Sequence, residues 1–120
     1  MQRLKIGISL KRLEGAEKVT GRTRYAGDLS FPGMLHARLV LSPYAHARII
    51  HIPKENLGID GVRVITAEDL PPSPEDADAP LLAREETRFC GQPVAVVLGE
   101  TEAAAEDAAA VLRARIAFEE

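Results

Sequence analysis

Apolar residues alternate with other residues over three stretches between residues 34 and 71, and this period of two predicts strands. The first strand is expected over residues 34–42 and the second over 47–53. The third is expected within 61–71, where a turn capped by Thr66 follows it. In the first strand, four apolar side chains fall on one face: Leu35, Ala37, Leu39 and Leu41. The S-P-Y-A-H segment between the first two strands suits a hairpin and a bent connection equally well.

The last third of the chain has the strongest pattern. Residues 94–98 read V-A-V-V-L, an apolar run typical of a strand that is buried on both faces. Thr101 suits the N-cap of a helix expected at about 101–113. The apolar stripe of that helix consists of Ala105, Ala108, Ala109 and Leu112. A last strand is expected over 114–120, so strand, helix and strand form a β-α-β unit in an α+β fold with a mixed sheet.

Glycine and proline mark the connecting segments. Residues 14–33 hold four glycines, which favours loops and short strands over helices. Residues 53–58 start with proline and end with glycine, so one helical turn is expected there. Residues 71–80 hold four prolines and three acids, a composition that predicts an exposed loop. Residues 1–11 are expected to form an extended arm.

The length and composition describe one ordinary domain spanning residues 1–120. Aromatic residues make up only 4% of the chain and Trp is absent, so the core must be aliphatic. The net charge of −3 argues against a nucleic-acid partner, which requires a basic surface. Residues 1–24 nevertheless hold seven cations against two acids, and this basic segment is expected to dock on an acidic surface or to be solvated.

The location of the protein is expected to be the cytoplasm. The chain has one cysteine, which suits a reducing compartment. It has no apolar run of about 18 residues, so no membrane span is predicted. Its first residues lack the apolar core and cleavage site of a signal peptide.

No motif for catalysis, phosphate binding or metal binding occurs in the sequence, and we assign no catalytic, cofactor-binding or metal-binding residue. The three histidines, His36, His46 and His51, are expected to be exposed or hydrogen-bonded, with a structural hydrogen bond favoured for His46. Cys90 is expected to be a small buried side chain. Gly91, Gln92 and Pro93 are expected to form the bend that starts the following strand, although an amide at Gln92 also suits a cleft.

Four blocks of the sequence, taken in order, resemble the large subunit of the xanthine dehydrogenase, aldehyde oxidase and carbon monoxide dehydrogenase family. The first is R-L-E-G-A-E-K-V-T-G-R-T-R-Y-A-G-D-L at 12–29, and the second is G-M-L-H-A-R-L-V-L-S-P-Y-A-H-A-R-I at 33–49. The third is G-V-R-V-I-T-A-E-D-L-P at 61–71, and the fourth starts with F-C-G-Q-P-V-A-V-V-L-G-E-T at 89–101. Glu14, Gly15 and Cys90 are mild departures from the family pattern.

The resemblance implies the α/β-hammerhead fold and an oxidoreductase parent protein. In that family the molybdopterin contacts and the catalytic glutamate lie in later domains, so no catalytic position carries over to this chain. The resemblance also implies iron–sulfur and FAD groups on partner domains or subunits. The missing molybdopterin-binding domains would be the main partner, and apolar surface left open by their absence would favour a homo-oligomer. The chain stops at Glu120 within a pattern, so the natural polypeptide is expected to continue.

Two other functions stay open at the level of the sequence. One is a stand-alone assembly or binding module with the same fold and no enzymatic activity. The other is a carrier domain of the lipoyl or biotin type, which requires a modified lysine at the tip of a hairpin. Lys54, in P-K-E-N, is the only candidate for such a lysine, and its neighbours do not match the pattern of those domains.

Overall fold

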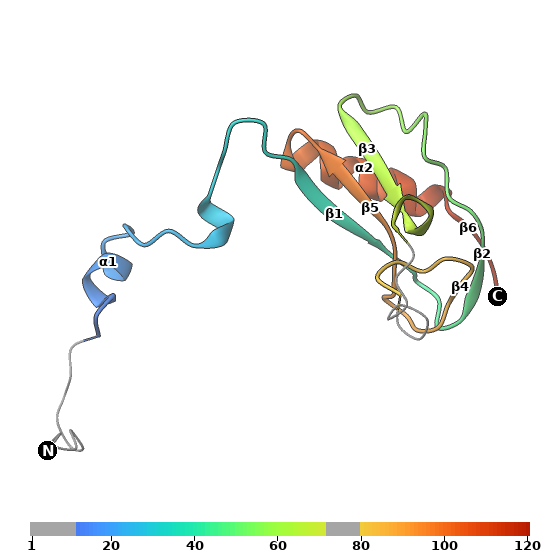
Figure 1. The fold of residues 1–120 in the computed structure, drawn as a ribbon, viewed down its shortest axis with the longest axis horizontal. Helices are drawn as coiled ribbons and strands as arrows, with labels where there is room; N and C mark the ends of the chain where they lie inside the picture. The colour runs from blue at the N-terminus through green and yellow to red at the C-terminus, as the bar shows by residue number, and fades with distance from the viewer. Residues whose placement is uncertain (1–11, 72–79) are drawn as a thin grey trace, which may run out of the picture. The chain divides into compact units, whose positions relative to one another are not determined.

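The computed structural model describes residues 12–71 and 80–120. The chain divides into two compact units, one ending at Pro32 and one starting at Gly33 (Figure 1). The arm expected at 1–11 lies outside the described residues, as does nearly all of the loop expected at 71–80.

The described part of the first unit contains two short helical elements, where loops and short strands were expected. Helix α1 spans Gly15–Val19 and the 3₁₀ helix η1 spans Ala26–Asp28. The expectation from the glycines was wrong because local side-chain bonds support helical turns here. The ammonium of Lys18 lies 3.5 Å from a carboxylate oxygen of Glu14, one turn earlier. Gly21 then has a φ of 69°, in the left-handed region that ends a helix.

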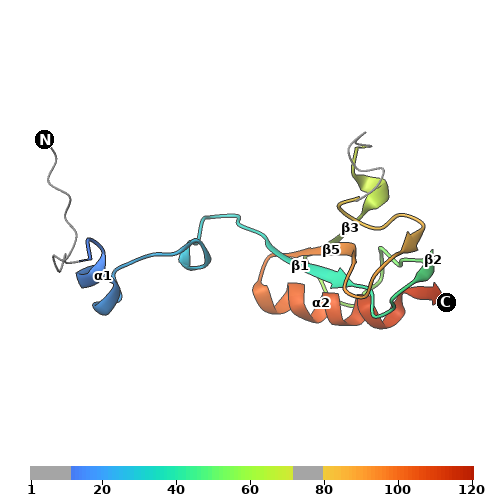
Figure 2. The same cartoon turned by 90° about the horizontal axis from the view of Figure 1, so that it is seen from below.

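In its described residues, 33–71 and 80–120, the second unit consists of two three-stranded antiparallel sheets and one main helix. Sheet A has the order β1-β5-β3, formed by His36–Leu41, Pro93–Gly99 and Val62–Thr66. Sheet B has the order β4-β2-β6, formed by Glu86–Thr87, Ala47–His51 and Ala117–Glu119. Helix α2, Glu102–Arg115, runs along one face of β1 and β5 (Figure 2). Strands β5 and β6 therefore lie in different sheets, on either side of the helix in sequence, and do not form a parallel pair.

Three connecting segments can be compared with their predictions from the sequence. Strands β1 and β2 belong to different sheets, so the connection between them is bent and is not a hairpin. Strand β3 leads into the 3₁₀ helix η2, Ala67–Asp69, with Thr66 at its N-cap as expected. The helical turn expected at 53–58 is absent. That prediction was wrong because Asn56, inside the segment, has a φ of 58°, which a right-handed turn does not allow.

Helix α2 starts where its capping residue predicts. The hydroxyl of Thr101 accepts a hydrogen bond from the backbone N–H of Ala104 at 3.1 Å. Three residues of the predicted stripe, Ala105, Ala108 and Leu112, are buried. The helix ends at Arg115, two residues beyond the expected end. No helix in the described part of the chain is long and apolar enough to cross a membrane.

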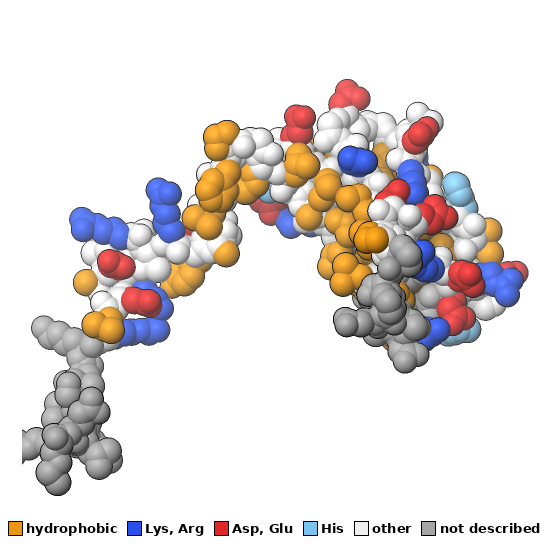
Figure 3. Space-filling model, viewed as in Figure 1, with side chains coloured by type: hydrophobic (Ala, Val, Ile, Leu, Met, Phe, Trp, Pro, Cys, Tyr) orange, Lys and Arg blue, Asp and Glu red, His pale blue; other side chains and the backbone are white. Residues whose placement is uncertain are grey.

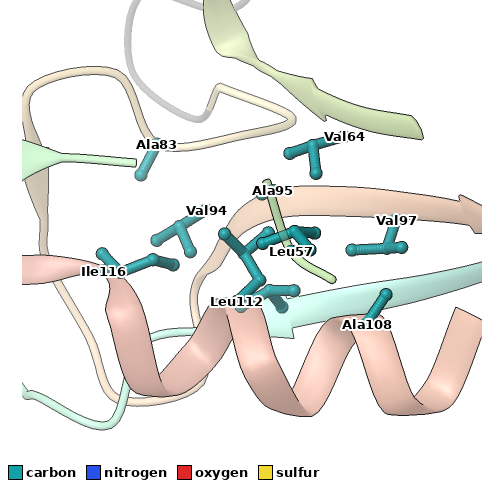
Figure 4. Close-up of a cluster of buried hydrophobic side chains, with 10 residues drawn as sticks. Leu57, Val64, Ala83, Val94, Ala95, Val97, Ala108, Leu112 and Ile116 are labelled. Atoms are coloured by element: carbon teal, nitrogen blue, oxygen red, sulfur yellow. The ribbon is translucent and has the colours of Figure 1, made fainter. Parts of the chain in front are cut away.

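The hydrophobic core lies between α2 and sheet A. Leu112 and Ala108 point from the helix toward side chains of β5, including Val94 and Val97 (Figure 4). All four of these side chains are fully buried. On the other face of β5, Val96 and Leu98 are only partly buried. The prediction that this strand is buried on both faces was therefore wrong, because α2 covers only one face of the sheet.

Candidate functional site

Two segments of the blocks quoted above, S-P-Y-A-H-A at 42–47 and G-Q-P at 91–93, meet at one corner of the second unit. The backbone N–H of Ser42 donates to the carbonyl of Gln92 at 2.9 Å. The N–H of Gly91 donates in return to the carbonyl of Ser42 at 2.8 Å. This reciprocal pair fixes the bend that precedes β5 to the end of β1. The bend expected at Gly91, Gln92 and Pro93 is thus present, and Gly91 has a φ of 89° there.

Buried polar side chains complete this corner. The hydroxyl of Ser42 lies 3.2 Å from that of Thr87, which in turn donates to the carbonyl of Ala47 at 3.3 Å. The amide oxygen of Gln92 accepts from the backbone N–H of Arg88 at 2.7 Å. Ser42, Thr87 and Gln92 are each at most 5% exposed. Their polar groups bond to the domain itself, so this arrangement makes a rigid corner.

The histidines do not converge on one point. The ring of His46 lies 3.3 Å from the carboxylate of Glu86, which is the structural hydrogen bond expected for it. This ring is 71% exposed. His36 is half-buried on β1 and His51 is exposed on β2. Within residues 12–71 and 80–120, no three His, Cys, Asp or Glu side chains come together as ligands of one metal ion would.

The carboxylate of Glu86 bonds to two side chains, Arg88 and His46. Arg88 donates to it from its guanidinium at 3.1 Å, on the opposite oxygen from His46. Arg88 first, and His46 second, lower the pKa of Glu86. The carboxylate is thereby kept ionised, which does not suit a general acid.

Cys90 is exposed, and the expectation of a buried thiol was wrong. The strand starts at Pro93, so Cys90 lies in the turn before it and not at the entrance to the sheet. Its thiol donates to the carbonyl of Pro43 at 3.5 Å. Among the described residues, no basic side chain forms a hydrogen bond with the Cys90 thiol.

A groove of about 670 Å³ lies beside the end of β2 and is also lined by η2 and by Ala83 and Arg84. Lys54 lies in this groove, in the segment after β2 and not at a hairpin tip. Its ammonium contacts the carboxylates of Glu68 at 3.2 Å and Asp69 at 3.0 Å. The two acids raise the pKa of Lys54. A carrier lysine must extend freely into solvent to be modified, whereas the Lys54 side chain is held by two ion pairs.

The face of sheet A opposite α2 is apolar and open in the described structure. We call it the outer face of sheet A. The register places Leu39, Val96 and Ile65 side by side in one row across the three strands. The next row consists of Ala37, Leu98 and Arg63. Figure 3 shows apolar side chains gathered over β1 and β5 on this face.

The sequence predicted the apolar row of β1 but not which way it points. Leu35 and Leu39 are 53% and 54% exposed, whereas their neighbour Val40 is 1% exposed and packs toward α2. The residues L-V-L at 39–41 are apolar on both faces of the strand. That run was the available signal that β1 has two apolar faces.

Residues 20–120 match the family model described as "Aldehyde oxidase and xanthine dehydrogenase, a/b hammerhead domain". The chain belongs to this family. The resemblance stated from the four sequence blocks is thereby confirmed, and so is the hammerhead fold with its two small antiparallel sheets and one main helix.

Individual relatives agree with the family match. The chain is 38% identical over 117 residues to the nicotine 6-hydroxylase large subunit of Paenarthrobacter nicotinovorans, a match that covers 86% of this chain and 14% of the relative. It is 36% identical over 115 residues to the xanthine dehydrogenase molybdenum-binding subunit of Escherichia coli O157:H7, covering 82% of this chain and 15% of the relative. The crystal structure of quinoline 2-oxidoreductase from Pseudomonas putida 86 superposes with a TM-score of 0.79 at 37% identity, covering 95% of this chain and 16% of that one.

This hammerhead chain spans only about one seventh of the length of the relatives that it matches. The names of those relatives describe large subunits and whole enzymes, one of them molybdenum-binding. Their names therefore concern proteins of which the hammerhead domain is a small part.

Proposed function

We propose that this hammerhead domain is the N-terminal structural and interface domain of a molybdopterin-dependent oxidoreductase large subunit and carries no catalytic residue of its own. The proposal rests on the fact that the buried polar side chains of the domain bond to one another and to its backbone, and not toward an open cavity. At the corner where the S-P-Y-A-H-A and G-Q-P segments meet, three buried polar side chains bond to groups of the same domain: Ser42, Thr87 and Gln92. The largest open feature of sheet A, its outer face, is apolar and suits packing against protein.

The described residues do not fit a molybdopterin site. Such a group needs donors and acceptors that converge on a cavity, and the buried polar groups here converge on each other. Two cations, Lys54 and Arg84, line the groove beside β2, and Lys54 is already paired with Glu68 and Asp69. We therefore place molybdopterin and the catalytic residues of the parent protein outside this domain, and derive no step of catalysis from it.

The partners that follow from this role are the other domains of the large subunit. Iron–sulfur and FAD-carrying domains or subunits would receive the electrons from the molybdenum centre. A molybdenum hydroxylase with these parts would act in the cytoplasm. The domain described here would contribute scaffold and contact surface to that assembly.

Molybdenum analysis of two samples tests the proposal. The first is the 120-residue chain produced alone, and the second is the native protein isolated from its source with the chains that accompany it. We expect no molybdenum in the first sample and about one molybdenum per large subunit, with dehydrogenase activity, in the second. Stoichiometric molybdenum in the isolated chain would contradict the non-catalytic role. Its absence from the native protein would contradict the enzyme assignment.

A stand-alone assembly or binding module is the second candidate. The exposed apolar side chains of the described part of the first unit, which include Leu13 and Val19, favour it because they suit contact with another chain. Sequencing of the coding region beyond codon 120, together with the intact mass of the native polypeptide, separates the two. A native mass equal to that of the 120-residue chain, without molybdenum, supports the module.

A further inference from the structure

The outer face of sheet A is unusual for a sheet covered on one side only. An antiparallel sheet with one solvated face normally alternates apolar and polar side chains across its two faces. Here the row formed by Leu39, Val96 and Ile65 is entirely apolar and crosses all three strands. Leu39 is 54% exposed at the edge of this row. The sequence of these strands is therefore suited to a sheet that is covered on both faces.

The opposite side of the domain, by contrast, has the charged surface of a side that faces water. Helix α2 covers the inner face of sheet A, and its own outward side carries charged residues: Glu102, Glu106, Asp107, Arg113 and Arg115. The guanidinium of Arg38, on β1, bonds to both Glu102 and Glu106 and ties the strand to the helix. A charged and paired surface of this kind is typical of contact with water. In the described residues, no helix or strand packs in the same way on the outer face of the sheet.

We propose that the outer face of sheet A docks on the remaining part of a molybdenum-hydroxylase large subunit, an inference that rests on the proposed function. The length of the relatives supports this occupant, because the matching segment is only 14% of the nicotine 6-hydroxylase large subunit and 16% of the quinoline 2-oxidoreductase chain. In such proteins a domain of this size has about six times its own length of polypeptide to pack against. The docking surface on that polypeptide is apolar opposite Leu39 and Val96.

Arg63, a charged residue of the outer face, predicts a complementary charge on the partner surface. Arg63 ends the second row of the outer face, beside Leu98 and Ala37. It is exposed, and among the described residues it forms no ion pair. A carboxylate of the partner is therefore expected opposite it, at the rim of an apolar contact.

Thiol labelling tests which face is covered. Cys90 is first replaced in the background variant Cys90→Ser, because its exposed thiol would react. The probe position is Leu39→Cys, on sheet A, and the matched control is Ile50→Cys, on sheet B. Both side chains are 54% exposed, so both thiols should react with N-ethylmaleimide at similar rates in the isolated chain. Reaction is followed by the mass of the proteolytic peptide that carries the probe position.

The same two variants are then made in the native protein, isolated with the chains that accompany it. We expect the Leu39→Cys thiol to react at least about tenfold more slowly there than in the isolated chain, because a reagent reaches a covered side chain only when the contact opens. A Leu35→Cys variant provides a second probe of the same face if the Leu39→Cys protein does not assemble. The Ile50→Cys thiol shows whether protection is specific to this face or general.

Each result decides the proposal. Equal reactivity of the Leu39→Cys thiol in both samples overturns it. Protection in an assembly that contains only copies of the 120-residue chain also overturns it, in favour of self-association. Molybdenum content measured on the same native sample keeps the two proposals separate. Molybdenum without protection contradicts the docking face alone, and protection by a longer polypeptide without molybdenum contradicts the enzyme assignment alone.

Discussion

Gly99, the last residue of β5, lies against the backbone of Ala105 in the first half of α2. A Cβ built on Gly99 would lie 2.8 Å from the nitrogen of Ala105 and 3.1 Å from its Cα. Ala105 and Ala108 are fully buried, so small side chains line this side of the helix. The absence of a side chain at position 99 allows α2 to approach the sheet this closely, and the core geometry depends on it.

Replacement of this glycine is expected to separate the helix from the sheet. The Gly99→Ala variant should lose about 1–3 kcal/mol of unfolding free energy, because the rigid backbone of Ala105 must move to admit the methyl group. Urea denaturation followed by circular dichroism measures the loss. Gly27→Ala is the control, since no atom lies within 4 Å of a Cβ at that position and its φ is not positive. Equal stability of the two variants would contradict the close packing described here.

The buried hydroxyl pair of Ser42 and Thr87 provides a second prediction. Thr87→Val keeps the volume of the side chain but removes the hydrogen bonds that it makes with Ser42 and with the carbonyl of Ala47. A loss of about 1 kcal/mol in unfolding free energy is expected, because two buried hydrogen bonds are lost while the Ser42 hydroxyl keeps its bonds with the backbone of Tyr44. Ser42→Ala and the double variant complete a thermodynamic cycle. The double variant should lose less than the sum of the single losses, and strict additivity would show that the two hydroxyls are not coupled.

The cap of α2 gives a third prediction. Thr101→Ala removes the oxygen that accepts from the N–H of Ala104, so it should cost about 1 kcal/mol of unfolding free energy. Thr101→Ser keeps a hydroxyl at the cap, so its unfolding free energy should remain close to that of the wild type. Thermal denaturation of the three proteins at one concentration measures the difference. A Thr101→Ser protein as unstable as Thr101→Ala would point to the lost methyl group in place of the cap.

Features set by neighbouring residues were predictable from the sequence. Thr101 and the alanine stripe predicted α2, and Thr66 predicted the capped turn after β3, because each signal acts within one helical turn. The helical turn predicted at 53–58 is absent because of the backbone conformation of one residue. Asn56 takes a left-handed conformation there, and the positions of proline and glycine alone do not reveal it.

Features set by distant residues were not predictable in this way. The contact of Ser42 with Thr87 joins residues 45 positions apart in sequence and depends on where each strand ends. Which face of β1 is buried depends on where α2 packs, and both faces of that strand are apolar at residues 39–41. The exposure of Cys90 follows from the start of β5 at Pro93, three residues after it. The candidate docking face therefore required the structure.

The pH dependence of stability gives a last prediction, which concerns Asp69. Its carboxylate accepts from the backbone N–H of Thr66 at 2.8 Å and contacts the ammonium of Lys54 at 3.0 Å. The hydrogen bond from the Thr66 backbone, followed by that from Lys54, lowers the pKa of Asp69 to about 2, from an ordinary value of 3.8. Because the pKa is lower in the folded state, the stabilising contribution is complete above about pH 4. It is lost as the pH falls through the folded-state pKa near 2.

The Asp69→Asn variant tests this assignment. Its urea midpoint should lie below that of the wild type at neutral pH, and the gap should narrow as the pH falls from about 4 toward 2. A carboxyl-carbon NMR titration of the wild type should place the midpoint of Asp69 near 2. Addition of 1 M NaCl weakens the exposed contact with Lys54 but not the hydrogen bond from Thr66, so the lowered midpoint should largely persist. A return of the midpoint to its ordinary value in salt would mean that Lys54, and not the capped turn after β3, holds this carboxylate in its ionised form.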